Sequence, residues 1–345
     1  MENFNFSATG YAGFEDELLR VRNSNRSVAQ TRRYLDWRYA KLDGAPEPVV
    51  FWIKSESGET VGMASLIFRK YWVNARPVHV GVLGDISLHA DLRGKGHGRQ
   101  MLEYVKNYLA QHMPDNPAFV IPNEAARKSL ISAGWKHGGK LVSYVLPLAH
   151  IDKLARILKS NFFIRQANAA VRKVLSFVTR LYIKKELSLQ LVSEPDTSFE
   201  TLWSDLSKEN LILSDRGFES LFWRYSAHPH NKFSIAKLMK KGAIAGYLIY
   251  TISPSDKTYQ VYDLLVKEQE DIFSMLALFL IQTLQHSDLY TIRLVLNDTH
   301  PYCKGLWKLG FIKRDDQPMF YKYWPVGFAL KGDASWLLSL GDKDI

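Results

Sequence analysis

The segment "ISLHADLRGKGHGRQMLEYVKNYLAQH", residues 86–112, joins an alternating apolar run to a long amphipathic helix pattern. Between the two lies Arg93-Gly94-Lys95-Gly96-His97-Gly98, which combines three glycines with cationic side chains. Glycines allow a positive φ and let a ligand approach the backbone closely. The first N–H groups of a helix lack intrahelical partners and carry a partial positive charge. The loop therefore predicts an anion site, typically for phosphate, at the start of this helix.

The spacing of the glycines narrows the class of loop. A P-loop would end in Gly-Lys-Ser/Thr, and a dinucleotide loop would read G-x-G-x-x-G; neither pattern is present here. The pattern present is R-x-x-G-x-G, on Arg93, Gly96 and Gly98. A second segment, "NEAARKSLISAGW" at residues 123–135, follows a short apolar run with Asn, a helix pattern and Gly-aromatic. In this order the two segments resemble the GNAT superfamily of N-acetyltransferases, whose loop binds the pyrophosphate of acyl-CoA.

The resemblance implies a donor site and a catalytic strand. It assigns contacts with acyl-CoA to Ile86, Leu88, Arg93, Gly94, Lys95, Gly96, His97, Gly98, Asn123 and Ala126. It also implies that the strand before the loop is splayed, so that the backbone N–H near Leu88 polarises the thioester carbonyl. Asp85 and His89 are the candidates for taking the proton of the acceptor amine. Many family members have a Tyr four residues before the glycine of the Gly-aromatic pair, which is proposed to protonate the leaving thiolate. This chain has Leu130 at that position, four residues before Gly134. The resemblance implies no metal.

The chain repeats its layout once. "YLDWRYAKLDGAPEPVVFWIKSESGETVGMASLIF" begins at Tyr34, and "SLFWRYSAHPHNKFSIAKLMKKGAIAGYLIYTI" begins at Ser220. Each copy has Trp-Arg-Tyr after a helix pattern, two strands, a strand with an acid (Asp85 or Asp263) and a long helix. A repeat of this length predicts a tandem duplication. The alternation of strands and helices predicts the α/β class with a mixed sheet, as two tandem GNAT-like domains.

The second copy departs from the first at the loop. "VKEQEDIFSML" stands where the first copy has its glycines, and Glu268, Glu270 and Asp271 precede the helix. Acids at a helix start complement its dipole and would repel a phosphate. The second half is therefore predicted to have a degenerate CoA loop and to help build the acceptor site. The alternative is a domain that only stabilises the first half.

The repeated Trp-Arg-Tyr segments have two interpretations. An Arg between aromatic residues can bind a phosphate or carboxylate of the acceptor, which makes substrate-binding candidates of Trp37, Arg38, Tyr39, Arg224 and Tyr225. Alternatively, each segment stabilises its own half, with the Arg bound to a buried carboxylate such as Asp85. Recurrence in both halves, only one of which has the loop, favours the structural interpretation.

Composition bounds the organisation of the chain. Its 345 residues suit two domains, and its single cysteine, Cys303, excludes an internal disulfide. No apolar run approaches the ~18 residues of a membrane span, and no signal-peptide pattern is present, so we expect a cytoplasmic protein. We predict a GNAT domain binding acyl-CoA at 1–150, a basic helical linker at 151–187, and a degenerate GNAT-like domain at 188–345. The linker pattern favours an apolar face packed on the domains over a membrane-surface helix.

The net charge of +10 attracts anions in general, among them nucleotide-linked substrates and CoA. The whole chain resembles tandem GNAT proteins of bacterial surface-polysaccharide pathways, such as those that make O-antigen. That resemblance implies an acyl-CoA-dependent N-acyltransferase acting on a nucleotide-linked amino sugar by direct attack in a ternary complex. It implies a small-molecule partner and no nucleic acid, and leaves monomer and homo-oligomer open.

Three other functions are compatible with parts of the sequence. One is an N-acyltransferase for an amino acid, a peptide or a thiol-precursor amine. Another is an aminoacyl-transferring relative with a tRNA donor, which the intact CoA-type loop disfavours. The third is a non-enzymatic protein that uses the basic segment 151–187 to bind a membrane or nucleic acid.

Overall fold

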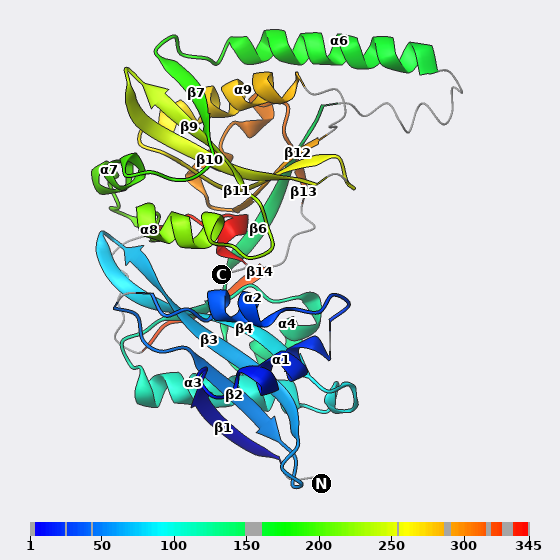
Figure 1. Ribbon diagram of the computed structural model, residues 1–345, viewed down its shortest axis with the longest axis vertical. Coiled ribbons are helices and arrows are strands. Elements are labelled where there is room, and N and C mark those ends of the chain that lie inside the picture. The colour runs from blue at the N-terminus through cyan, green and yellow to red at the C-terminus, as the bar shows by residue number, and fades with distance from the viewer. Residues whose placement is uncertain are drawn as a thin grey trace.

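The computed structural model describes residues 4–24, 26–42, 44–148, 161–253, 255–285, 291–314, 319–325 and 334–343. In the first half, strands and helices alternate as the sequence pattern predicts, and these elements lie in the lower part of Figure 1, except for the last strand, Lys136–Pro147, which extends into the upper part. They are β1 (Asn5–Gly10), α1 (Glu15–Asn23), α2 (Arg32–Arg38), β2 (Val49–Lys54), β3 (Thr60–Val73), β4 (Arg76–Leu88), α3 (His97–His112), β5 (Ala118–Val120), α4 (Glu124–Ser132) and β6 (Lys136–Pro147).

The second half repeats this order above the first. Its elements are α6 (Asn161–Arg180), β7 (Leu187–Val192), α7 (Ser198–Asp205), β8 (Leu211–Ser214), α8 (Phe218–Leu221), β9 (Ser234–Lys240), β10 (Ala243–Ser253), β11 (Thr258–Val266), α9 (Ile272–Thr283), β12 (Thr291–Asn297), β13 (Ile312–Arg314), β14 (Met319–Tyr323) and β15 (Ser335–Trp336). Both Gly-aromatic pairs of the repeat have glycine at positive φ, +79° at Gly134 and +88° at Gly310. Glycine is favoured there because a side chain is strained in that conformation.

The described strands form one mixed sheet of 15 strands. Its main path runs β1-β2-β3-β4-β5-β14-β6-β12-β11-β10-β9-β7, with β4–β5 and β11–β12 parallel. This confirms the predicted α/β class with a mixed sheet. The two halves are joined by exchanged pairing, because β14 from the C-terminal segment lies between β5 and β6. β6 in turn continues into the second half by pairing with β12.

The hydrophobic core lies on both faces of the sheet in each half. In the first half, α3 and α4 cover one face and α1 and α2 the other. In the second half, α6 and α9 pack on one face and α7 and α8 on the other. A further cluster spans the two halves and includes Tyr71, Phe119, Ile212, Phe320 and Trp336. The chain end therefore lies at the centre of the molecule, as the label C in Figure 1 shows.

Helix α6 lies along the outer edge of the second half, across α9 (Figure 1). It forms more than half of the predicted linker 151–187, whose residues 151–160 lie outside the described part of the chain. Leu175 on the helix and Tyr182 just after it pack on the core of the second half, as expected for the apolar face of a linker. Four other apolar side chains in and just after this helix are exposed instead, namely Val171, Val174, Phe177 and Leu181. None of the described helices is long and apolar enough to cross a membrane.

Candidate functional site

The end of β4 is released from its neighbours by two irregularities. Asp85 and Ile86 form a β-bulge opposite β3, and φ of Asp85 is +50°. A bulged residue is left without a ladder partner and turns the strand locally. On the other edge, β5 pairs with β4 only at Gly81 and Val82. Beyond Val82 the two parallel strands separate, so the last part of β4 has an open edge.

The backbone of Leu88 faces that open edge. The N–H of His89 donates to the carbonyl of Val61 on β3, at 2.8 Å. Successive N–H groups of a strand point to opposite edges. The N–H of Leu88 is therefore directed away from β3, toward the gap that β5 leaves.

The Arg93–Gly98 loop lines a cavity of about 880 Å³, the large cavity, between β4, α3 and α4. Gly96, at φ +91°, is the N-cap of α3 and supplies no capping side chain. A side chain at Gly96 would point into open space, whereas one at Gly98 would lie 3.2 Å from Ser129 Oγ and 3.3 Å from Leu88 Cδ1. The open helix N-terminus and the close approach at Gly98 fit a phosphate group.

Most of the donor-site candidates line the large cavity. They are Ile86, Leu88, Arg93, Gly94, Gly96, Gly98, Asn123 and Ala126. Lys95 and His97 are not among its described lining residues, and the His97 ring packs on Phe4 at 4.6 Å. Asn123 also caps α4, because its Oδ1 accepts a hydrogen bond of 3.0 Å from the N–H of Ala126. Leu130 is fully buried in the core and offers no acid to the cavity.

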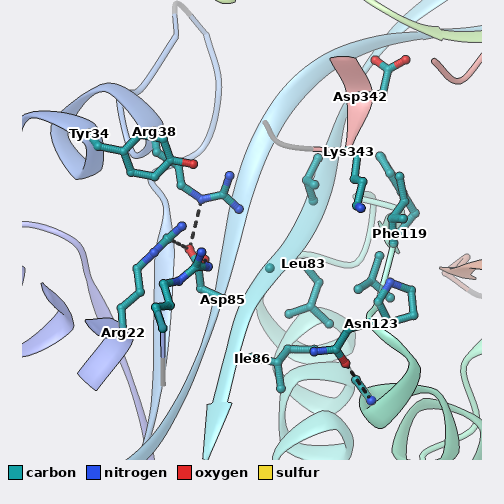
Figure 2. A pocket seen from close by; sticks show the side chains of 17 residues that line it. Arg22, Tyr34, Arg38, Leu83, Asp85, Ile86, Phe119, Asn123, Asp342 and Lys343 are labelled. Atoms are coloured by element: carbon teal, nitrogen blue, oxygen red, sulfur yellow. Dashed lines mark hydrogen bonds and ion pairs between the residues drawn. The ribbon is translucent and has the colours of Figure 1, made fainter. Parts of the chain in front are cut away.

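A second cavity of about 240 Å³, the small cavity, lies where the two halves meet. Figure 2 shows Arg22, Arg38 and Asp85 on one side of it and Phe119 on the other, with Asp342 and Lys343 from the C-terminal segment above. The two cavities share six lining residues, namely Arg22, Arg26, Asp85, Ile86, Asn123 and Ala126. They therefore meet where β4 and β5 separate.

Asp85 is the centre of a buried polar cluster. One carboxylate oxygen, Oδ2, accepts hydrogen bonds from Arg38 Nε at 3.0 Å and the Tyr39 hydroxyl at 2.9 Å. Arg22 Nη1 forms an ion pair with the same oxygen, and Arg26 Nη2 lies 3.5 Å from Oδ1. Burial alone would raise the pKa of Asp85, but Arg38 and Arg22 hold it below its ordinary value. A carboxylate stabilised in this way is a weak base.

The second half contains the counterpart of this cluster. Asp263 accepts hydrogen bonds from Arg216 Nε at 3.0 Å and from the hydroxyl of Tyr225 at 3.1 Å. Asp342 lies 3.0 Å from Arg216 Nη2 and 3.4 Å from Arg224 Nη1. All five side chains are almost fully buried. Arg224 and Tyr225 are thus enclosed in the second half, and neither is among the described lining residues of the two cavities.

The two Trp-Arg-Tyr segments meet at the interface between the halves. The rings of Trp37 and Trp223 stack at a centroid distance of 5.1 Å. Each indole N–H donates to the carbonyl oxygen of the other Trp, at 2.8 Å from Trp37 and 3.2 Å from Trp223. Of the substrate candidates, Arg38 lines the small cavity, whereas Trp37 and Tyr39 are buried and are not among its described lining residues. His89 is absent from the described lining of both cavities and pairs with Asp91 at 3.3 Å.

Sequence reasoning did not identify several residues of the small cavity. Arg22 lies in the last turn of α1, Arg26 follows the helix, Tyr34 lies on α2, and Lys343 belongs to the C-terminal segment. The sequence marks these residues only by the basic end of an amphipathic helix pattern around Arg22. Such a basic end ordinarily indicates a solvent-exposed helix face. The sheet topology, not local sequence, brings them together.

A comparison with known protein families finds a match, which covers about a third of the chain. Residues 15–130 match the model of the Acetyltransferase (GNAT) family. No curated protein sequence matches the chain. The matched residues extend from α1 into α4, so they contain the bulged strand, the glycine loop and α3.

Solved structures resemble most of the chain. A probable N-acyltransferase from Enterococcus faecalis V583 is 12% identical with a TM-score of 0.63, covering 93% of this chain and 72% of that one. A GCN5-related N-acetyltransferase from Anabaena variabilis ATCC 29413 is 13% identical with a TM-score of 0.64, covering 92% and 72%. A tandem GNAT protein from the clavulanic acid biosynthesis pathway is 13% identical with a TM-score of 0.55, covering 93% and 98%. At these identities the similarity shows the fold, which is a GNAT fold.

Proposed function

We propose that this chain, an acyltransferase with a GNAT fold, transfers the acyl group of acyl-CoA to the amino group of a nucleotide-linked amino sugar. The meeting of the two cavities is the observation that carries the proposal. The large cavity offers a glycine loop and an uncapped helix start for the pyrophosphate of CoA. The small cavity adjoins it at Ile86 and Asn123, where the thioester would face the acceptor.

The chemistry requires a neutral amine, a polarised carbonyl and an exit for the thiolate. The Leu88 N–H, directed into the gap beside β4, is placed to donate a hydrogen bond to the thioester oxygen. The ammonium form of the acceptor loses one proton, and the neutral amine nitrogen bonds to the carbonyl carbon. The C–S bond breaks, and the nitrogen gives up a second proton as the amide forms. The departing thiolate of CoA takes up a proton. A backbone donor fixed in a strand needs no rearrangement as charge develops on the oxygen.

Direct attack by the amine suits the site better than an acyl-enzyme intermediate. Cys303 is the only cysteine of the chain and lies in the second half. Burial raises the pKa of its thiol to about 11, so it would be protonated at neutral pH and a poor nucleophile. Asp85 is held by cations and His89 lies outside the cavities. We therefore propose that the amine loses its proton to water, and that Asp85 positions the arginines around the acceptor.

The acceptor class is supported by the resemblance to tandem GNAT proteins of polysaccharide pathways and by the cationic side chains around the small cavity. The donor is acyl-CoA, and the described residues hold no cluster of metal-ligating side chains. A small-molecule acceptor fits a cavity of about 240 Å³ better than a nucleic acid would. We propose a cytoplasmic enzyme, because CoA and nucleotide-linked sugars are supplied there.

The test is a thiol-release assay with acetyl-CoA and longer acyl-CoAs against a panel of acceptors. The panel contains nucleotide-linked amino sugars, free amino sugars, amino acids and short peptides. The proposal expects the highest kcat/KM with a nucleotide-linked amino sugar. A higher kcat/KM for an amino acid or a peptide would contradict the proposed acceptor class but would still support acyl transfer. Absence of thiol release with every amine, in a protein that binds CoA, would contradict the acyl transfer.

A further inference from the structure

We propose that the acceptor carries an oxyanion, a phosphate or a carboxylate, which binds Arg22 and Arg26 in the small cavity. The inference rests on the proposed acyl transfer and names the group by which the acceptor is held. It follows from a comparison between the two halves, which contain the same kind of buried cluster with different charge balances.

In the second half the cluster is electrically balanced. Arg216 and Arg224 face two carboxylates, Asp263 and Asp342, and all four side chains are at most 5% exposed. The charges cancel, and no external counter-ion is needed. Buried charges are stable when they are paired and hydrogen-bonded in this way.

In the first half the corresponding cluster is unbalanced. Three guanidinium groups, those of Arg22, Arg26 and Arg38, face the single carboxylate of Asp85, which leaves two positive charges in excess. Lys343 adds a further cation to the lining. The only other acid in the lining, Asp342, is engaged by Arg216 and Arg224. The excess faces the small cavity, whereas in the second half Asp263, Arg216 and Arg224 are absent from the described lining of both cavities and Asp342 reaches the small cavity with its charge already paired.

The guanidinium group of Arg22 has an N–H donor without a hydrogen-bond partner among the described residues. Its side chain is 3% exposed and lines the cavity, yet its Nε has no hydrogen-bond partner among the described residues. Arg26 is 40% exposed and lies 3.5 Å from Asp85 Oδ1, a long contact that leaves its guanidinium available to a ligand. Burial and repulsion by Arg22 lower the pKa of Arg26, and a bound anion would relieve that repulsion. Guanidinium groups bind phosphate and carboxylate oxygens through paired N–H donors.

The oxyanion could belong to the acceptor or to an acidic acyl group on the donor, because the two cavities meet at this cluster. The acceptor is favoured because the small cavity extends from the cluster toward Lys343, away from the loop that would hold CoA. Figure 2 shows Lys343 on the side of Leu83 and Phe119, opposite Arg22. An acceptor anion held near the arginines would leave its amine to reach the gap beside β4.

Isothermal titration calorimetry of inorganic pyrophosphate into the full-length protein tests the site. Saturating acetyl-CoA is present throughout, so that the loop of the large cavity is already filled. We expect pyrophosphate to bind the loaded protein, and Arg26→Gln to weaken its binding at least tenfold, ~1.4 kcal/mol. Arg33→Gln is the matched control, because Arg33 is exposed on α2 outside both linings. It removes the same charge from the same half and should leave the affinity unchanged.

Three results would overturn the inference. The first is no pyrophosphate binding to the loaded wild-type protein at physiological salt. The second is an equal loss in Arg26→Gln and Arg33→Gln, which would indicate diffuse charge attraction. The third is a loss in Arg26→Gln confined to the affinity for succinyl-CoA, which would assign the cluster to the acyl group. Pyrophosphate binding is also measured in Gly96→Glu without CoA, so failure of the donor site and failure of this site are distinguished.

Discussion

Asp85 and Asp263 occupy matching positions, and their surroundings decide which role each residue has. Each carboxylate accepts a hydrogen bond from a tyrosine hydroxyl and at least one from a guanidinium group of its own half. Only Asp85 faces a cavity. A base must release its cationic partners before it can take a proton, and the contacts of Asp85 oppose this. The carboxylate therefore acts as the fixed anion that holds the arginines of the small cavity in place.

Asp85→Asn should lower the free energy of unfolding by ~3–5 kcal/mol at neutral pH, because it leaves buried guanidinium charges without their partner. The folded pKa of Asp85 is lowered, so its contribution is present above the unfolded value of ~3.9 and is lost as pH falls through the folded value. Urea denaturation of both proteins should show a constant difference from about pH 5 to 7 and a smaller difference in stronger acid.

Asp263→Asn is the matched control for this prediction. Both variants should lose stability, and both should keep kcat within a few-fold when the folded fraction is taken into account. A loss of on the order of 10²-fold in kcat for Asp85→Asn alone, with CoA binding intact, would restore Asp85 as the general base.

Among the individual residues of the site, the sequence predicted those that belong to a motif of consecutive positions. The loop Arg93–Gly98 and the cap Asn123 belong to local patterns, and the structure places them at one cavity, except for Lys95 and His97. Arg22 and Lys343 were not predictable in this way. They lie some 60 and 260 positions from Asp85, and only sheet pairing brings them to the same cavity.

Helices α3 and α9 are matching elements whose N-termini have diverged. At α3 the N-cap is Gly96, and the large cavity lies before it. At α9 the N-cap is Asp271, which is fully buried and forms ion pairs with Lys184 and Lys240. Burial would raise the pKa of Asp271, but hydrogen bonds from both lysines lower it, so it is ionised at neutral pH. Asp271 thus occupies the start of α9 together with its two lysines, and no residue of α9 is among the described lining residues of the two cavities.

The protein should therefore bind one CoA per chain, and Gly96→Glu should weaken that binding at least tenfold, ~1.4 kcal/mol. A glutamate there would direct a side chain and a negative charge into the space before α3. Gly242→Glu is the control, because Gly242 lies at φ +84° with no atom near its added Cβ, and Gly96 lies at +91° in the same situation. The backbone strain is thus matched. Calorimetry showing two sites, or equal affinity in the two variants, would contradict the assignment.

On the scale of the whole molecule, the duplication has produced one sheet. The repeat in the sequence predicts two similar halves, a GNAT domain at 1–150 and a degenerate GNAT-like domain at 188–345. We propose these two ranges as the two halves of the chain. Their strands are interleaved, because β14 lies beside β5 and β12 lies beside β6. The hydrophobic pattern of a strand does not show which strand will pair with its edge, because every strand edge offers the same backbone N–H and C=O groups. The sequence could therefore predict the elements but not the exchange.

The interleaving predicts that the two halves unfold together. A fragment of residues 1–148 would lose β14 from between β5 and β6, the β12 partner of β6, and the core contributed by Ile212, Phe320 and Trp336. It should not refold to a CoA-binding state. In the full chain, urea unfolding followed by far-ultraviolet circular dichroism and by CoA binding should give coincident transitions, since every unit of structure depends on the shared sheet. Separate transitions, or a fragment that binds CoA with wild-type affinity, would show that the first half is an independent folding unit, and that the small cavity is completed by docking of the second half.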